Sequence, residues 1–161
     1  MAGKAFAVTI VPRWADIDFN RHMRHSAVAD WAGYARSEWL DAHGLSMQRL
    51  TALNVAPLLF EESTRYFKEI FIGERITIEL QLAGANHDGS RWVLRHTFRR
   101  EDTMCAVHEA RGAWFDVVTR RIVPPPPGVR EAYADMMRTD DYAELVSNER
   151  VVPALSVDTH D

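Results

Sequence analysis

A long apolar run near the N-terminus, residues 26–43, constrains the fold of this chain most. Hydrophobic side chains recur there at helical spacing and leave only a narrow polar stripe. A surface helix has a wide polar face, so this helix is expected to be largely enclosed. Ser26 is a favourable N-cap residue, and Gly44 stands where a left-handed residue ends many helices.

Before and after this helix, apolar and polar residues alternate with a period of two. Residues 6–11 predict a first strand that ends near Trp14, and four later runs predict strands at residues 58–67, 75–82, 91–99 and 104–118. In the last run both alternating sets are partly apolar, which is typical of a central strand. One long helix followed by antiparallel hairpins indicates an α+β fold in which a curved antiparallel sheet wraps around the helix.

The C-terminal part begins with four consecutive prolines at residues 124–127, which are expected to end the sheet and stiffen a linker. Residues 1–127 then form the main domain. Residues 128–161 form an extension with short helices near residues 130–137 and 142–146 and a flexible acidic tail. The exposed edges of such a sheet need cover, so a homodimer or a dimer of dimers is expected.

Composition excludes several classes of protein. A chain of 161 residues can bury a core of its own, and a net charge of −4 gives no indication of nucleic-acid binding. No segment is apolar enough to span a membrane, and the N-terminus lacks a signal-peptide cleavage pattern. The single cysteine, Cys105, cannot form an intrachain disulfide, so we expect a cytoplasmic protein.

The residues that carry chemistry are concentrated at residues 16–25, which read Asp-Ile-Asp-Phe-Asn-Arg-His-Met-Arg-His. A side chain at this junction can face a reacting carbonyl, while the first N–H groups of the helix supply free donors. Such a loop is most often turn and capping chemistry, but two histidines and an enclosed helix favour catalysis. Asp16 is expected to pair with Arg13 or Arg21. Two histidines without a nearby cysteine argue against a zinc site, so no metal is expected.

Over residues 5–127 the chain resembles the hotdog-fold thioesterases, in the branch of 4-hydroxybenzoyl-CoA and related acyl-CoA thioesterases. Departures from the family pattern are Arg21 in place of glycine, and Arg24 with His25 in place of two asparagines. The resemblance rests on Trp14-Ala15-Asp16-Ile17-Asp18, on His22-Met23, on Tyr34-Ala35-Arg36, and on Tyr66-Phe67-Lys68-Glu69 followed by Gly73-Glu74-Arg75-Ile76.

The resemblance implies hydrolysis of an acyl-CoA or acyl-carrier-protein thioester to the free acid and thiol, without a cofactor. In that family the second carboxylate of the Asp-x-Asp pair is catalytic, which assigns Asp18 as nucleophile or general base. Asn20 would orient water or the carboxylate, and His22 or His25 would relay a proton or hold the substrate. Backbone N–H groups around residues 27–29 would polarise the carbonyl. The helix start would contact the substrate through Ser26, Ala27, Val28 and Trp31.

Other groups compete for these roles. Asp30 is the main rival, because another hotdog branch carries its catalytic carboxylate on the helix; Glu61 and Glu62 are weaker candidates. Cys105 is expected to be an inert buried thiol. A basic stripe is interpreted first as a solvated face balanced by acids such as Glu79, and second as a contact for CoA phosphates. The stripe consists of Arg91, Arg95, Arg99 and Arg100.

Two further functions stay open. Enoyl-thioester hydration is the first, although that branch has its histidine five positions after the aspartate, whereas His22 lies four after Asp18. The second is a non-catalytic acyl-CoA-binding dimeric module that keeps the fold without activity.

Overall fold

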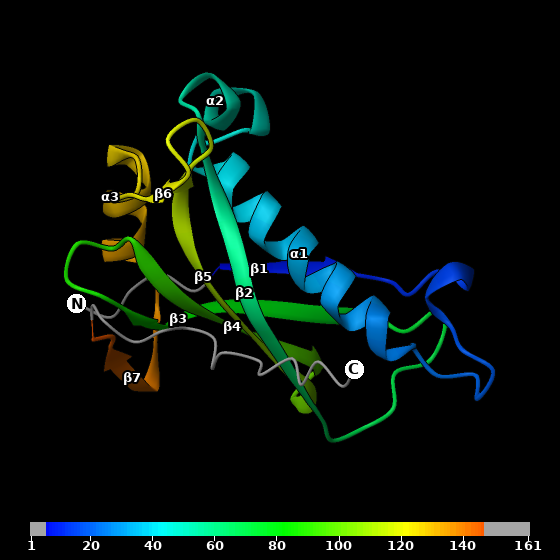
Figure 1. Cartoon of the computed structure of the whole chain (residues 1–161). Helices are drawn as coiled ribbons and strands as arrows, with labels where there is room; N and C mark the ends of the chain where they lie inside the picture. The colour runs from blue at the N-terminus through cyan, green and yellow to red at the C-terminus, as the bar shows by residue number, and fades with distance from the viewer. Residues whose placement is uncertain (1–5, 147–161) are drawn as a thin grey trace, which may run out of the picture.

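A curved sheet with one long helix across its face organises this chain (Figure 1). The computed structural model describes residues 6–146. Its helices are α1 (His25–Ala42), α2 (Met47–Ala52) and α3 (Pro127–Asp135), with a 3₁₀ turn at Trp14–Asp16. Its strands are β1 (Phe6–Ile10), β2 (Val55–Tyr66), β3 (Ile76–Ala85), β4 (Arg91–Arg100), β5 (Thr103–Asp116), β6 (Arg121–Ile122) and β7 (Arg138–Glu144).

The strand order is β1-β3-β4-β5-β2, and each neighbouring pair in it is antiparallel. The short β6 pairs with β5, and β7 pairs with β3 in parallel. This arrangement confirms the α+β hotdog fold. The four long strands predicted from periodicity are all present, whereas β1 ends at Ile10 and the chain near Trp14 forms the 3₁₀ turn.

Helix α1 buries one face against the sheet through Ala27, Val28, Ala32, Ala35 and Trp39. Its opposite face is exposed, so the helix is less enclosed within this chain than its composition indicates. The left-handed Gly44 that follows it, with φ of 71°, is confirmed.

The expectation that Ser26 caps α1 is wrong. The helix begins at His25, and the N-cap position is held by Arg24, whose side chain makes no capping bond. The Ser26 hydroxyl instead accepts a hydrogen bond from the Arg24 guanidinium. As the second residue of the helix, Ser26 lies past the position from which a side chain caps the first free amides.

The core has two parts along α1. Near the end of the helix, Trp39 stacks on Tyr133 of α3, with ring centroids 5.5 Å apart, above Trp92 and Trp114 of the sheet. Near its start, small side chains of the helix pack on a second cluster that includes Phe98. The face of α1 that packs on the sheet is therefore formed by small side chains near its start and by the large Trp39 near its end.

The C-terminal segment differs from its prediction. Helix α3 corresponds to the helix expected near residues 130–137, but the segment expected to be a second helix is strand β7. The prolines do not end the sheet, because β7 returns to it and pairs Ala143 with Gly84 and Glu144 with Ala85. The predicted tail beyond residue 146 lies outside the described residues. None of the helices within residues 6–146 has the length and hydrophobicity needed to cross a membrane.

The approach of β2 to β5 depends on Gly112. A Cβ atom there would lie 2.3 Å from the Leu58 carbonyl oxygen and 2.5 Å from the Trp92 ring. We expect Gly112→Ala to lower the free energy of unfolding by about 2 kcal/mol or more, because neither the strand backbone nor the packed ring can move away. Chemical denaturation measures the loss.

The matched control is Gly128→Ala in α3, where the added Cβ would meet only Leu45 at 3.8 Å. That substitution should be neutral or slightly stabilising. Equal stability of the two variants would contradict the close approach at Gly112.

Candidate active site

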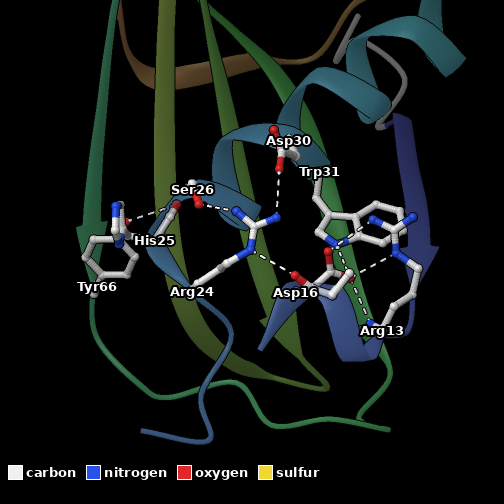
Figure 2. A network of polar contacts seen from close by, with 9 residues as sticks. Arg13, Asp16, Arg24, His25, Ser26, Asp30, Trp31 and Tyr66 are labelled. Atoms are coloured by element: carbon white, nitrogen blue, oxygen red, sulfur yellow. Dashed lines mark hydrogen bonds and ion pairs between the residues drawn. The ribbon is translucent and has the colours of Figure 1, made fainter. Parts of the chain in front are cut away.

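The buried carboxylate of Asp16 anchors the loop between β1 and α1 (Figure 2). Its Oδ2 accepts hydrogen bonds from the Arg13 backbone N (2.8 Å), from Arg13 Nε (3.1 Å) and from Trp31 Nε1 (3.2 Å). Its Oδ1 accepts from Arg13 Nη2 at 3.0 Å. The hydrogen bonds from Arg13 are the main cause of a lowered pKa for Asp16. The expected pairing with Arg13 is confirmed, and Asp16 has a structural role.

Arg24 joins the other end of this loop to the helix (Figure 2). Its backbone N donates to the Asp16 carbonyl at 2.7 Å, and its Nε donates to the Ala15 carbonyl at 2.9 Å. The guanidinium also contacts Asp30, at 3.4 Å. The loop is thus tied to the start of α1 by backbone and side-chain bonds together.

Asp18 lies at the tip of this anchored loop. Its Oδ1 accepts from the backbone N of Asn20 (2.8 Å) and of His22 (3.2 Å). Its own backbone N donates to the His22 carbonyl at 2.8 Å. These bonds hold one carboxylate oxygen and fix the orientation of the other. The tight turn also requires Arg21 to adopt a left-handed φ of 66°. Glycine adopts this conformation without steric cost, which explains why the hotdog-fold thioesterases that the chain resembles have glycine at this position.

A cavity of about 390 Å³ opens beside Asp18, and we call it the catalytic cavity. It brings together Asp18, His22, His25 and Val28 of the predicted set. Its opposite wall comes from the end of β2 and the segment after it. The remaining lining residues are Met23, Tyr66, Phe67, Lys68, Glu69, Ile70 and Ala106.

The free amides of α1 lie in its first turn. The N–H of Ala27 donates to the Arg24 carbonyl at 3.0 Å, so this donor is already used. Within the described residues, the first-turn N–H groups without a backbone acceptor are those of His25, Ser26 and Val28. Of the donors expected around residues 27–29, that of Val28 therefore stays open, and those of His25 and Ser26 add to it at the positive end of the helix dipole.

Four of the predicted residues do not line this cavity. Asn20 contributes its backbone N to Asp18 and has an exposed side chain. Ser26 is bonded by Arg24, and Ala27 is buried beneath the helix. Trp31 packs between the Arg13 guanidinium and Asp16, so the structure shows it in a supporting position.

The rival acids lie elsewhere. Asp30 faces solvent and Arg24 (Figure 2) and does not line the catalytic cavity, and Glu61 is exposed. Glu62 is exposed, as expected for a solvated face, and it also contacts His108 (3.2 Å) and Arg36 (3.7 Å). Cys105 is buried, as expected.

The basic stripe is balanced by acids, which confirms its first interpretation. Arg95 pairs with Glu109 and Asp141, Arg99 with Glu79, and Arg100 with Glu74. Arg91 instead lies over the Phe60 ring. These partners leave the stripe little capacity for CoA phosphates.

The sequence does not predict the opposite wall of the cavity as part of a site. The segment Tyr66-Phe67-Lys68-Glu69 carries the family resemblance but no catalytic residue type in a recognisable spacing. Its position beside α1 depends on the pairing of Tyr66 with Ala106 in β5, which local spacing does not reveal. Among residues 6–146, no three metal-binding side chains are grouped to hold an ion.

Solved structures similar to this one share the fold over most of the chain. A hypothetical protein of Staphylococcus aureus in complex with CoA has a TM-score of 0.76 at 24% identity, covering 86% of this chain and 90% of that one. A 1,4-dihydroxy-2-naphthoyl-CoA thioesterase from Synechocystis has a TM-score of 0.74 at 18% identity, covering 82% and 97%. The gentisyl-coenzyme A thioesterase BH1999 has a TM-score of 0.69 at 16% identity, covering 80% and 98%.

The curved antiparallel sheet wrapped on α1 is the fold of the hotdog-fold thioester hydrolases. The family model described as the thioesterase-like superfamily matches residues 12–133. The chain therefore belongs to the thioesterase-like superfamily. None of the curated proteins matches the sequence.

We expect Asp16→Asn to lower the free energy of unfolding by about 2 kcal/mol, because an amide cannot accept from all the donors and adds an N–H facing Arg13. The folded pKa of Asp16 is depressed, so its contribution is complete above the unfolded value of about 4. The contribution is lost as the pH falls through the folded pKa.

Urea denaturation at several pH values measures this difference. The gap between the native protein and Asp16→Asn should narrow as the pH falls below about 4. A gap that stays constant down to strongly acidic pH would contradict the role given to the ionised carboxylate.

Proposed function

We propose that this protein hydrolyses an acyl-CoA thioester to the free acid and CoA, with Asp18 as the catalytic carboxylate. The observation that carries the proposal is that Asp18 lines one cavity together with His25 and Val28, whose backbone N–H groups have no backbone acceptor within the described residues. A carboxylate and unpaired helix amides are the two elements that thioester hydrolysis needs.

The chemistry follows from these positions. The carbonyl oxygen of the thioester accepts from the open amides, which stabilise the charge that develops on it. Asp18 either removes a proton from the attacking water or attacks the carbonyl itself to form an anhydride that water then cleaves. In both routes the C–S bond breaks, the CoA thiolate leaves, and a proton from solvent or from His22 or His25 neutralises it.

Several features support CoA as the carrier. One similar structure contains CoA, and two others are named for acyl-CoA substrates. The mouth of the catalytic cavity carries Lys68 and the aromatic side chains of Tyr66 and Phe67, which suit phosphate and pantetheine groups respectively. A carrier-protein thioester presents the same pantetheine arm and is the alternative donor. The single cysteine fits a reducing cytoplasm as the site of the reaction.

We also propose a homodimer, alone or as part of a dimer of dimers, formed through β2. This strand ends the β1-β3-β4-β5-β2 order and runs for twelve residues with most side chains exposed, including Leu58, Leu59 and Tyr66. A long exposed edge strand with apolar side chains requires cover. Because Tyr66 also lines the catalytic cavity, a second copy on β2 would lie close to the substrate.

Replacement of Asp18 by asparagine should lower kcat/KM for acyl-CoA hydrolysis by at least about a hundredfold, because an amide neither removes a proton nor attacks a carbonyl. A thiol-release assay over a panel of acyl-CoA substrates measures the rate, and circular dichroism checks the fold. The matched control is Asp30→Asn, which should retain most activity.

An active Asp18→Asn beside an inactive Asp30→Asn would show that the residue assignment is wrong while the reaction stands. Conversion of crotonyl-CoA to the hydroxyacyl form would support hydration instead. Binding of acyl-CoA without any thiol release would support the non-catalytic module.

The proposed homodimer can be tested by the mass of the protein in solution and by amide exchange in β2. Light scattering at micromolar concentration should give twice or four times the mass of the chain. Backbone amides of β2 should also exchange slowly with deuterium, because both sides of the strand are then hydrogen-bonded. A monomer with rapid exchange along β2 would contradict the proposed interface.

A further inference from the structure

Five polar side chains form a continuous row under α1, outside the catalytic cavity; we call them the polar row. They are Arg36 of α1, Glu62 and Thr64 of β2, His108 of β5 and His96 of β4. The strand register places Thr64 opposite His108 and His108 opposite His96. Both histidines are almost completely buried and Arg36 is largely buried, whereas Glu62 ends the row at an exposed position on β2.

Hydrogen bonds fix the protons within the polar row. His96 Nδ1 lies 3.1 Å from the His108 carbonyl, so it carries the proton and leaves Nε2 to accept from Arg36 Nη1 at 3.4 Å. His108 lies between the Thr64 hydroxyl (2.8 Å) and Glu62 (3.2 Å). Burial lowers the pKa of both histidines, so they are neutral at pH 7. The row then carries one positive charge, on Arg36, and one negative charge, on Glu62.

Arg36 has more donors than partners in this row. A guanidinium has five N–H donors, and this side chain is only 15% exposed. Its contacts within the described residues are the hydrogen bond to His96 and the ion pair with Glu62, whose 3.7 Å separation exceeds hydrogen-bond length. A largely buried donor group with unused capacity fits an acceptor supplied by a ligand.

A second cavity, of about 320 Å³, begins at Arg36, and we call it the aromatic cavity. Its walls come from α1, β2, the sheet floor and α3, and its volume suits the apolar part of a small molecule. Apart from Arg36 and Ser37 its lining is mainly apolar and aromatic. The remaining lining residues are Gly33, Trp39, Leu40, Pro57, Leu59, Trp92, Leu94, Trp114 and Tyr133.

The polar row lies between the two cavities. Along β2, Tyr66 lines the catalytic cavity, Thr64 and Glu62 belong to the row, and Leu59 lines the aromatic cavity. Strand β2 runs beside α1 (Figure 1), so the same sequence of environments follows the helix. Arg36 reaches back along it, because a Cβ on Gly33 would lie 3.6 Å from Arg36 Nη2.

We propose that Arg36 and Glu62 select acyl groups that carry a hydroxyl near the middle of the chain, with the apolar remainder held in the aromatic cavity. A hydroxyl accepts from Arg36 and donates to Glu62, and it adds no charge to a pair that is already balanced. A carboxylate at the same place would face Glu62 without a second cation. This inference rests on the proposed acyl-CoA hydrolysis.

The length of α1 indicates which carbon of the acyl chain would carry the hydroxyl. A rise of about 1.5 Å per residue places Gly33 about 12 Å along α1 from the His25 amide, which opens into the cavity. An extended alkyl chain, whose C–C bonds of about 1.5 Å advance in a zigzag, covers that distance in roughly nine bonds. The hydroxyl is therefore expected near carbon ten of the acyl group.

The test compares stearoyl-CoA with stearoyl-CoA hydroxylated at one carbon from eight to twelve, and takes the ratio of kcat/KM for each hydroxylated substrate to that of stearoyl-CoA. In the native protein the best ratio should exceed one. Arg36→Met keeps the length of the side chain but removes its donors, and should lower this ratio by about tenfold or more. The matched control is Arg65→Met, an exposed arginine of β2, which should leave the ratio unchanged.

Glu62→Gln gives a second readout if Arg36→Met does not fold. Without the negative charge the guanidinium is uncompensated, so hydrolysis of sebacoyl-CoA should rise several-fold relative to decanoyl-CoA. Ratios that stay the same in both variants, in a protein that hydrolyses these substrates, would overturn the selection by Arg36 and Glu62 alone. Absence of thiol release from every acyl-CoA would overturn the proposed function first.

Discussion

The buried Asp16 carboxylate is the interaction on which the rest of the site depends. It is fully buried, and a carboxylate in that position is costly unless donors surround it. Arg13 and Trp31 supply those donors from the two sides of the loop, one just after β1 and one on α1. The same bonds that stabilise the charge therefore fix the distance between the loop and the helix, and with it the position of Asp18.

The two carboxylates of the Asp-x-Asp pair differ in how many of their oxygens are occupied by hydrogen-bond donors. Both oxygens of Asp16 are occupied by donors, so none remains for a substrate. In Asp18 the backbone N–H groups of Asn20 and His22 hold Oδ1, and the residue lines an open cavity. A carboxylate that is oriented through one oxygen and open at the other has the geometry of a nucleophile or a base.

The sequence predicted most of the fold because alternation and helical periodicity report directly which face is buried. Its errors occur where the competing partner is distant. Residues near Tyr142 form a strand because they pair with Gly84 and Ala85 of β3, beyond the stretch of β3 that pairs with β1 within the described residues. Ser26 is not the cap because the helix begins one residue earlier, at His25, where Arg24 is bonded to the loop around Asp16. Neither competition can be read from local propensity.

In the candidate site too, the residues close together in the sequence were predicted and those from a distant strand were not. Asp18, His22 and His25 meet in one cavity, as expected for residues within a single short loop. Their partners across the cavity were not predicted as site residues, because Tyr66 reaches it only through the register of β2 on β5. The site thus combines a local motif with a contribution from a distant strand.

The polar row depends on an irregularity in strand β2 that the alternation of the sequence does not reveal. Strand β2 has a register shift between Leu59 and Glu61. Strict alternation from Leu59, which lines the aromatic cavity, would turn Glu61 toward α1 and Glu62 away from it. The extra residue reverses the alternation, so that Glu62 meets His108 and Arg36 while Glu61 faces solvent. A one-residue shift in an edge strand therefore supplies the only acid that balances Arg36 among the ion pairs of the described residues.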